Sequence, residues 1–193
     1  MPSIPNTRID VANAALLAGD FATARDEFET LLRLGSKQAL VGLATIYERG
    51  NKDVPKDVSK AIEYYERAFI EAKSAYAARM LGRFHYHGYG VPMDYDKAFY
   101  YYSKLENSTD AVGLLSLGWM YEMGRGVTED VDKARMLYRR ATKLGNIQAR
   151  KHWGMLELKH GSPLLGVVLW GWAILQGIPL IIVKSDDSRL RSY

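Results

Sequence analysis

The chain has no cysteine among its 193 residues, and this absence excludes whole classes of site. Without thiol groups it can form neither a disulfide framework nor a thiolate metal site, and the composition favours a reducing compartment. Proline is also scarce, with six residues, while 48% of the chain is hydrophobic. This balance is typical of a folded chain rather than a disordered one.

Signatures of targeting and of catalysis are missing as well. The amino-terminal sequence has no basic segment followed by an apolar run, so we expect no signal peptide. We find no glycine-rich phosphate loop with a lysine, no nucleophile elbow and no paired-carboxylate motif. His85 and His87 lie near Asp94 and Asp96, but histidines two apart on a helix end point to different faces. We therefore predict no enzyme, no metal and no other cofactor. We also predict a cytoplasmic location, with the cytoplasmic face of a membrane as an alternative.

The net charge of +4 is small, but the two signs are separated along the chain. Residues 1–132 hold 15 Lys/Arg against 19 Asp/Glu, whereas residues 133–160 hold eight Lys/Arg and one acidic residue. Arg135, Arg139 and Lys143 are four apart there and form one ridge of a helix. Such a ridge is typical of a solvated helix face. The alternative is that its charge acts together with the apolar segment that follows it in the chain. We do not expect the chain to bind nucleic acid, because proteins that bind single strands usually interleave basic residues with aromatic residues.

The most informative feature present is a repeated pattern. Sequences starting at Leu43, Leu81 and Leu117 follow one template with a period of roughly 36 residues. In each unit a small residue, an aromatic residue and a small or aliphatic residue recur at i, i+4 and i+7, which lie on one helix face. These sets are Ala61, Tyr65 and Ala68; Ala98, Tyr102 and Leu105; and Ala134, Tyr138 and Ala141. Related sets are Ala24, Phe28 and Leu31 near the start, and Gly166, Trp170 and Ala173 near the end. Five helix pairs are predicted.

The helix that precedes each set carries matching signals. Gly118, in the third unit, is a small residue where two helices cross, and Gly124 is suited to end the first helix. Asp130 is then placed to cap the second helix. The preceding unit has Gly82 and Asp94 at the corresponding places.

The pattern LG-x-x-Y-x-x-G-x-GV-x-x-D-x-x-KA-x-x-YY resembles the Sel-one-like repeat (SLR) family, a branch of the tetratricopeptide superfamily. Residues 37–146 fit it in three units. The resemblance implies an all-α, right-handed α-solenoid of about five antiparallel helix pairs that serves as an adaptor for other proteins. We divide the chain into a tetratricopeptide-like helix pair (1–36), three SLR units (37–146), a degenerate apolar repeat or membrane segment (147–183) and a polar tail (184–193).

In tetratricopeptide-like folds the first helices line a concave groove, and the resemblance implies which residues face a ligand there. These candidates are Asn13, Thr45, Glu48, Arg79, Arg83, Tyr86, Trp119 and Glu122. Arginine can hold a carboxylate through two hydrogen bonds, and aromatic rings anchor side chains at low entropic cost. We predict capture of a peptide segment or partner helix with an acidic element. The alternatives are a solvated pair of Arg79 and Arg83, and a core position for Trp119.

A rival function is a hydrolase with its active site in the same groove. Such a site would show converging polar groups with shifted pKa values. We expect none.

The last apolar stretch, residues 161–183, contains no charged residue. It is long enough for the roughly 20 apolar residues of a membrane helix, but Trp170 and Trp172 lie at its middle rather than at its edges. The apolar side chains surround the helix, so we predict docking to a membrane or membrane complex, or contact with protein. Docking residues are Leu165, Val168, Leu169, Trp172 and Leu175, with the basic Arg135, Arg139 and Lys143 beside them. A soluble homo-oligomer formed through this end, and a merely hydrophobic capping segment, are the alternatives.

Overall fold

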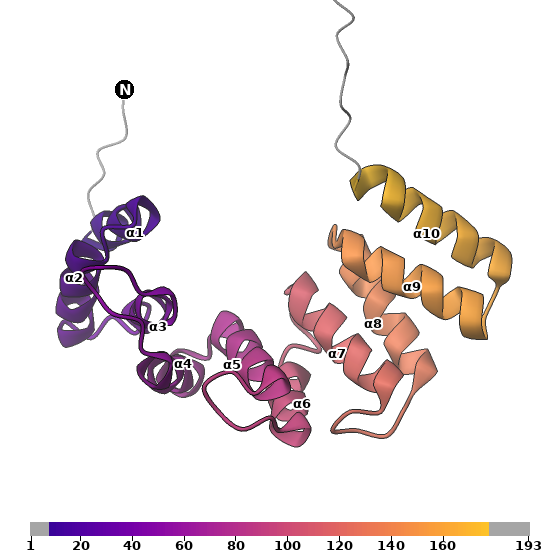
Figure 1. Ribbon diagram of the computed structural model, residues 1–193, viewed down its shortest axis with the longest axis horizontal. Helices are drawn as coiled ribbons and strands as arrows, with labels where there is room; N and C mark the ends of the chain where they lie inside the picture. Colours follow the sequence, from indigo (N-terminus) through magenta and orange to yellow (C-terminus); the bar gives the residue numbers. More distant parts are fainter. Residues whose placement is uncertain (1–7, 178–193) are drawn as a thin grey trace, which may run out of the picture.

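The structure is a computed structural model that describes residues 8–177, and in this range the chain forms ten helices and no strand. The helices pack as five consecutive pairs along an open arc (Figure 1). The pairs are α1 (Arg8–Ala18) with α2 (Phe21–Arg33), α3 (Ala39–Arg49) with α4 (Val58–Ala72), α5 (Ala75–His87) with α6 (Tyr95–Ser103), α7 (Ala111–Met123) with α8 (Val131–Lys143), and α9 (Ile147–His160) with α10 (Pro163–Gly177). The predicted all-α solenoid is confirmed.

The first helices of successive pairs face the inner side of the arc. In Figure 1, α3, α5 and α7 lie on that side, while α2, α4 and α6 lie on the outer side. A surface shared by several first helices can therefore meet one partner along the concave side.

Local signals set the ends of the helices. Asp57, Asp94 and Asp130 precede α4, α6 and α8, and each carboxylate accepts a hydrogen bond of 2.9 Å from the backbone N–H three residues further on. Such caps satisfy backbone donors that the helix leaves unpaired. Gly88 and Gly124 end α5 and α7 with left-handed backbone conformations, as the sequence predicted.

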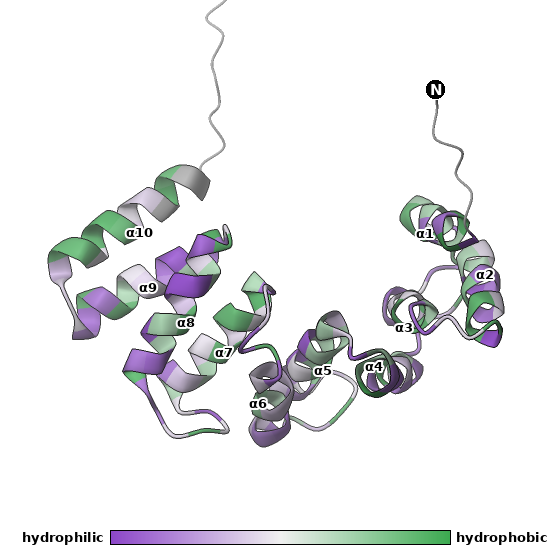
Figure 2. Ribbon diagram, turned by 180° about the vertical axis from the view of Figure 1, so that it is seen from behind, coloured by the Kyte–Doolittle hydropathy of each residue, from purple (hydrophilic) through white to green (hydrophobic). Residues whose placement is uncertain are grey.

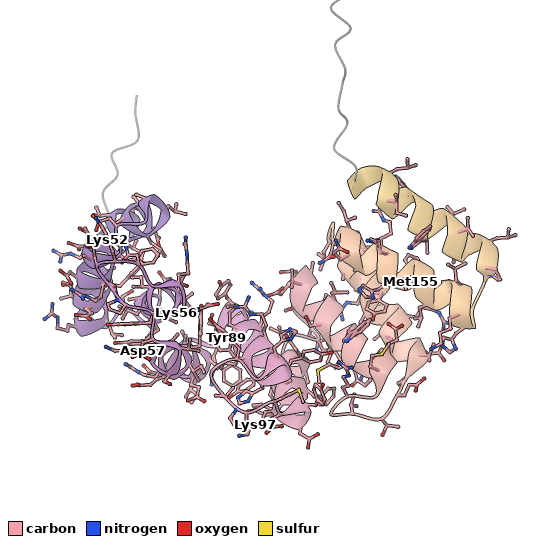
Figure 3. The ribbon with its side chains drawn as sticks, in the orientation of Figure 1. Lys52, Lys56, Asp57, Tyr89, Lys97 and Met155 are labelled. Carbon is pink, nitrogen blue, oxygen red and sulfur yellow. The ribbon has the colours of Figure 1, made fainter. Side chains whose placement is uncertain are left out.

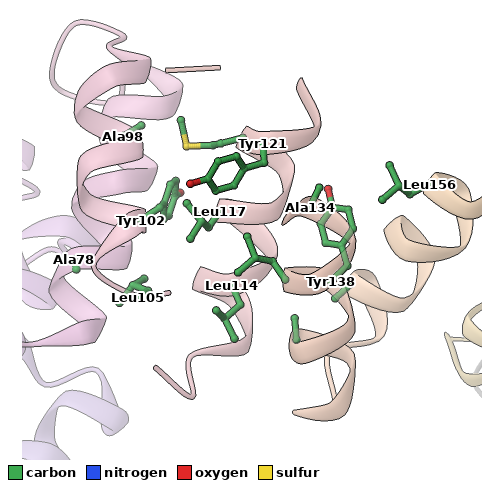
Figure 4. Close-up of a cluster of buried hydrophobic side chains, with 14 residues drawn as sticks. Ala78, Ala98, Tyr102, Leu105, Leu114, Leu117, Tyr121, Ala134, Tyr138 and Leu156 are labelled. Carbon is green, nitrogen blue, oxygen red and sulfur yellow. The ribbon is translucent and has the colours of Figure 1, made fainter. Parts of the chain in front are cut away.

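Glycine and tyrosine fit together at the helix crossings. A Cβ atom at Gly118 would lie 2.7 Å from the ring of Tyr138, and one at Gly82 would lie 2.8 Å from the ring of Tyr102. Both tyrosines belong to the hydrophobic cluster that joins α5 to α9 (Figure 4). The recurring small and aromatic residues are thus the packing contacts of the solenoid.

The last pair departs from this arrangement. Trp170 occupies the tyrosine place of the repeat but keeps 42% of its surface exposed. The reason is that α9 and α10 approach at glycines: a Cβ atom at Gly154 would lie 2.8 Å from the backbone nitrogen of Trp170. With the two backbones this close, an aromatic side chain has no room between the helices.

Within residues 8–177 no helix has the length and hydropathy required to cross a bilayer, and α10 has 15 residues. The rest of the predicted apolar stretch, 178–183, and the predicted polar tail lie outside the described residues.

Candidate functional site

Two of the three central pairs share a hydrogen bond between a carboxylate on the first helix and a tyrosine on the second. The hydroxyl of Tyr65 donates to Glu48 Oε2 at 2.8 Å, and that of Tyr138 donates to Glu122 Oε2 at 2.6 Å. Burial raises the pKa of both tyrosines far above the usual range, so both hydroxyls remain donors. Glu48 and Glu122, which were predicted to face a ligand, therefore also hold their helix pairs together.

The middle pair has a different residue at this place. Tyr86 stands where its neighbours have Glu48 and Glu122, so Tyr102 has no carboxylate opposite it. The Tyr86 hydroxyl instead accepts a hydrogen bond of 2.7 Å from Trp119 Nε1, and a second one from the Arg125 guanidinium. This contact joins α5 to α7 and brings together two of the predicted binding residues.

A pocket of about 220 Å³ lies beside this contact. Its walls come from the first helices α5, α7 and α9 and from Tyr102 on α6; the lining residues are Tyr86, His87, Tyr102, Leu115, Ser116, Trp119 and His152. Pockets for drug-sized molecules measure about 300–1,000 Å³, so this one suits a single large side chain. Its aromatic walls favour an apolar or aromatic group.

The two histidines of the pocket were not among the predicted residues. The His152 ring meets the Trp119 ring edge-on at 5.0 Å, and burial lowers the pKa of His152, so the ring is neutral at neutral pH. Ser116 and His152 each stand two places before the small residue of their first helix, Gly118 or Gly154. Extending the repeat register to that place would have found Ser116 and His152, but not His87.

The expectation of a groove without converging, shifted polar groups is wrong. Ser116, His87 and His152 do converge on the pocket, and burial raises the pKa of Tyr102 to about 12. However, the Ser116 hydroxyl donates to the Val112 carbonyl at 3.0 Å, and within residues 8–177 no hydrogen bond joins it to either histidine. The pocket therefore lacks the nucleophile and base contact that a serine hydrolase needs.

The two predicted arginines bind carboxylates of neighbouring pairs rather than solvent alone. Arg79 Nε donates to Asp110 Oδ2 at 2.8 Å, and Arg83 donates to Glu48. The Arg83 side chain is 45% exposed, so it can exchange Glu48 for a partner's carboxylate more readily than the less exposed Arg79.

The remaining predicted groove residues lie nearer the amino terminus. The Thr45 hydroxyl donates to the Val41 carbonyl at 2.8 Å and also lies 3.4 Å from the Tyr65 hydroxyl. Asn13 is exposed on α1 and does not line the pocket.

The repeat pattern also matches a known family model. The model described as Sel1 repeat matches residues 37–69, 75–107 and 111–146, which together are more than half of the chain. The chain belongs to the Sel1 repeat family. Sel1 repeat proteins are generally non-catalytic adaptors and scaffolds that bind other proteins.

Relatives share the repeats over part of their length. This Sel1 repeat chain is 32% identical to human protein sel-1 homolog 2, over 62% of the chain and 18% of that protein. It is 31% identical to the ERAD-associated E3 ubiquitin-protein ligase component HRD3A of Arabidopsis thaliana, over 64% of the chain and 20% of that protein. The chain thus spans about a fifth of the length of these relatives.

A solved structure with the same fold is a protective antigen of uropathogenic Escherichia coli that displays an SLR fold. The TM-score is 0.79 at 24% identity, over 90% of this chain and 38% of the antigen. At this identity the likeness shows the fold alone.

Beyond the Sel1 repeats, the residues of α10 are mostly hydrophobic (Figure 2). Of the predicted docking residues, Leu165, Val168, Trp172 and Leu175 are exposed. Leu169 is buried, so it does not contribute to the exposed surface of α10.

The basic ridge lies on α8, with α9 packed between α8 and α10, and its side chains are only partly available. Arg135 Nε donates to Glu157 Oε1 at 2.8 Å, and Arg135 also pairs with Asp132. The Arg139 guanidinium lies 5.5 Å from the centre of the Trp153 ring, and Lys143 is exposed.

Proposed function

We propose that this chain is a non-catalytic adaptor that binds a partner protein through its concave groove. A large apolar side chain of the partner enters the pocket between α5, α7 and α9. The observation that carries the proposal is the contact between Tyr86 and Trp119, which places two aromatic walls on adjacent pairs around one opening. Aromatic residues in well-packed pockets contribute most of the binding energy in many protein interfaces.

The rim of the groove supports an acidic element in the partner. Arg83, His87, Glu48 and Tyr89 line a second concavity that shares His87 with the pocket. A carboxylate of the partner binds Arg83 there in place of Glu48, and Glu48 keeps its hydrogen bond from Tyr65. The Arabidopsis relative is named as a component of a ubiquitin ligase, which also fits an adaptor role.

Site-specific photocrosslinking in cells tests the groove. A photoreactive phenylalanine analogue at His87 should give a discrete crosslinked protein, whereas the same analogue at Lys52 should not. The double variant Arg83→Ala and Trp119→Ala should lose the product while keeping its helical circular dichroism. Unchanged crosslinking by a well-folded double variant would place the binding site elsewhere.

We further propose that α10 docks the adaptor to a membrane or membrane complex. Exposed leucine, valine and tryptophan side chains on a terminal solenoid helix, which is usually polar outside, support this proposal. Arg139 and Lys143 on α8, which α9 separates from α10, favour an anionic surface, where each cation contributes about 1 kcal/mol.

Co-sedimentation with vesicles tests the docking. The intact chain should bind phosphatidylcholine vesicles that contain phosphatidylserine, and Val168→Ser, Trp172→Ser and Leu175→Ser together should abolish binding. Leu17→Ser on α1 is the matched control, because Leu17 is equally apolar and also exposed. Absence of binding, together with a mass that rises with concentration, would favour a homo-oligomer through α10.

A further inference from the structure

A separate concavity lies on the outer side of the solenoid, opposite the groove, between the second helices α4 and α6 (Figure 1). It has a volume of about 460 Å³. Phe69 and Ile70 line it from α4, and Tyr100 lines it from α6. Lys73 and Lys104, which directly follow these two helices, complete the lining. We call it the outer site.

The floor of the outer site is apolar and held in place by ring contacts. The Phe69 ring packs edge-on against the rings of Tyr100 and Tyr101, with centres 6.3 and 5.3 Å apart. Ile70 and Tyr100 are nevertheless 63% and 49% exposed. Neighbouring exposed apolar groups on a rigid surface are typical of an interaction site.

The backbone at Lys73 is unusual. Among the non-glycine residues in 8–177, Lys73 alone has a left-handed φ, of 52°. Glycine has the corresponding role after α2 and α8, at Gly35 and Gly145, each with a φ of 88°. This conformation is disfavoured for a residue with a side chain, so the fold itself would favour glycine at this helix end. The lysine side chain lies at the edge of the outer site.

Both lysines bring positive charge to the apolar floor. The Lys104 ammonium lies 4.5 Å from the centre of the Tyr100 ring. Glu71, at the end of α4, has its carboxylate paired with Arg67 at 2.9 Å, so this pair adds no net charge. The Glu66 carboxylate also acts on Tyr101, but the two lysines outnumber it. A ligand that fits the outer site therefore combines an apolar group with negative charge.

We propose that the outer site binds a segment of a second protein in which an apolar side chain is flanked by acidic residues. Two helices form the site without enclosing it, which suits a peptide segment lying across them better than a small molecule. Because this site and the groove lie on opposite sides of the solenoid, one chain can hold two partners at once.

Titration of the full chain with synthetic peptides tests this proposal. The probe is a hexapeptide with leucine and phenylalanine between two pairs of glutamates, and its control has lysines in place of the glutamates. Backbone amide resonances of α4 and α6 should shift with the acidic peptide, and its affinity should exceed that of the basic one roughly tenfold.

Substitutions separate binding from folding. Lys73→Gly with Lys104→Ser should weaken the acidic peptide roughly tenfold. Lys73→Gly alone should raise the Tm by about 2–4 °C, because it relieves the left-handed backbone. Lys52→Ser, on the amino-terminal arm in Figure 3, is the control and should leave the affinity unchanged.

Three outcomes would overturn the proposal. They are equal binding of both peptides, unchanged affinity of the lysine double variant, and shifts confined to residues of the groove such as Trp119. Trp119→Ala should not affect binding at the outer site, so the outcome is independent of the function proposed for the groove.

Discussion

The middle repeat and its two neighbours have the same backbone plan but different inner surfaces. In the neighbours, Glu48 and Glu122 each accept a hydrogen bond from a buried tyrosine of the same pair. In the middle repeat, Tyr86 turns to Trp119 of the next pair, and a pocket lies beside it. The difference teaches that these three repeats keep the same packing residues, while a change of one residue on the inner face is accompanied by a pocket there.

Substitutions in the core should destabilise the middle repeat and its neighbour to the same extent. Gly118→Val and Gly82→Val each place a branched side chain where even a Cβ atom would lie within 3 Å of a tyrosine ring. We expect each to destabilise the chain by about 3 kcal/mol, at the upper end of overpacking effects. Urea unfolding followed by circular dichroism measures this. Gly171→Val on α10 is the control, since no atom lies within 4 Å of its Cβ position. A large effect at only one of the two crossings would show that the repeats differ in the core as well.

A substitution on the inner face of the middle repeat should affect partner binding much more than stability. Tyr86→Glu gives the middle repeat the residue of its neighbours and removes one wall of the pocket. We expect crosslinking from His87 to fall roughly tenfold or more, because aromatic anchors commonly contribute at least about 2 kcal/mol to binding. The free energy of unfolding should change by less than about 1 kcal/mol, because the new carboxylate can accept a hydrogen bond from Tyr102. Retained crosslinking by a folded Tyr86→Glu chain would contradict the role given to the pocket.

The buried tyrosine hydroxyls provide a smaller contrast. Tyr138→Phe removes a hydrogen bond to a carboxylate, for which we expect a loss of about 2 kcal/mol in unfolding free energy. Tyr102→Phe removes a hydroxyl with no carboxylate opposite and should cost less than about 1 kcal/mol. The two variants are compared in the same urea titrations. Equal losses would mean that the carboxylate of Glu122 adds nothing to its pair.

The sequence predicted the ten helices because each pair carries its own signals. A capping aspartate such as Asp130, a glycine such as Gly118 and a tyrosine such as Tyr138 act within one pair, so their spacing along the chain is enough. Exposure of Trp170 was not predictable in this way. It depends on how closely α9 and α10 approach at Gly154, which is a distance between backbones rather than a spacing in sequence.

The sequence could predict which helix faces form the candidate site, but not which side chains touch there. The repeat register placed Tyr86 and Trp119 on the inner side of their helices. It could not show that the Tyr86 hydroxyl would meet Trp119 Nε1, since that contact depends on side-chain directions in two different pairs. The pairing of Arg83 with Glu48 was missed for the same reason.

The smallest expected effect concerns the histidines, which again differ between the repeats. His85 stands where the neighbouring repeats have Tyr47 and Tyr121, and burial lowers the pKa of both His85 and His152. A lowered pKa means that the unfolded chain binds protons more readily than the folded one. The contribution of the two histidines to the free energy of unfolding is therefore fully present above the unfolded pKa of about 6.5. This contribution falls as the pH drops below that value.

We accordingly expect the urea concentration at the unfolding midpoint to decrease when the pH is lowered from 7.5 to 5.5. His152→Asn should reduce this fall, whereas His160→Asn, at an exposed position at the end of α9, should leave it unchanged. His85→Tyr gives the middle repeat the tyrosine of its neighbours and should also reduce the fall. If neither His85→Tyr nor His152→Asn alters the pH dependence, other titratable groups cause it. The histidine of the middle repeat would then be a packing residue like the tyrosines of the neighbouring repeats.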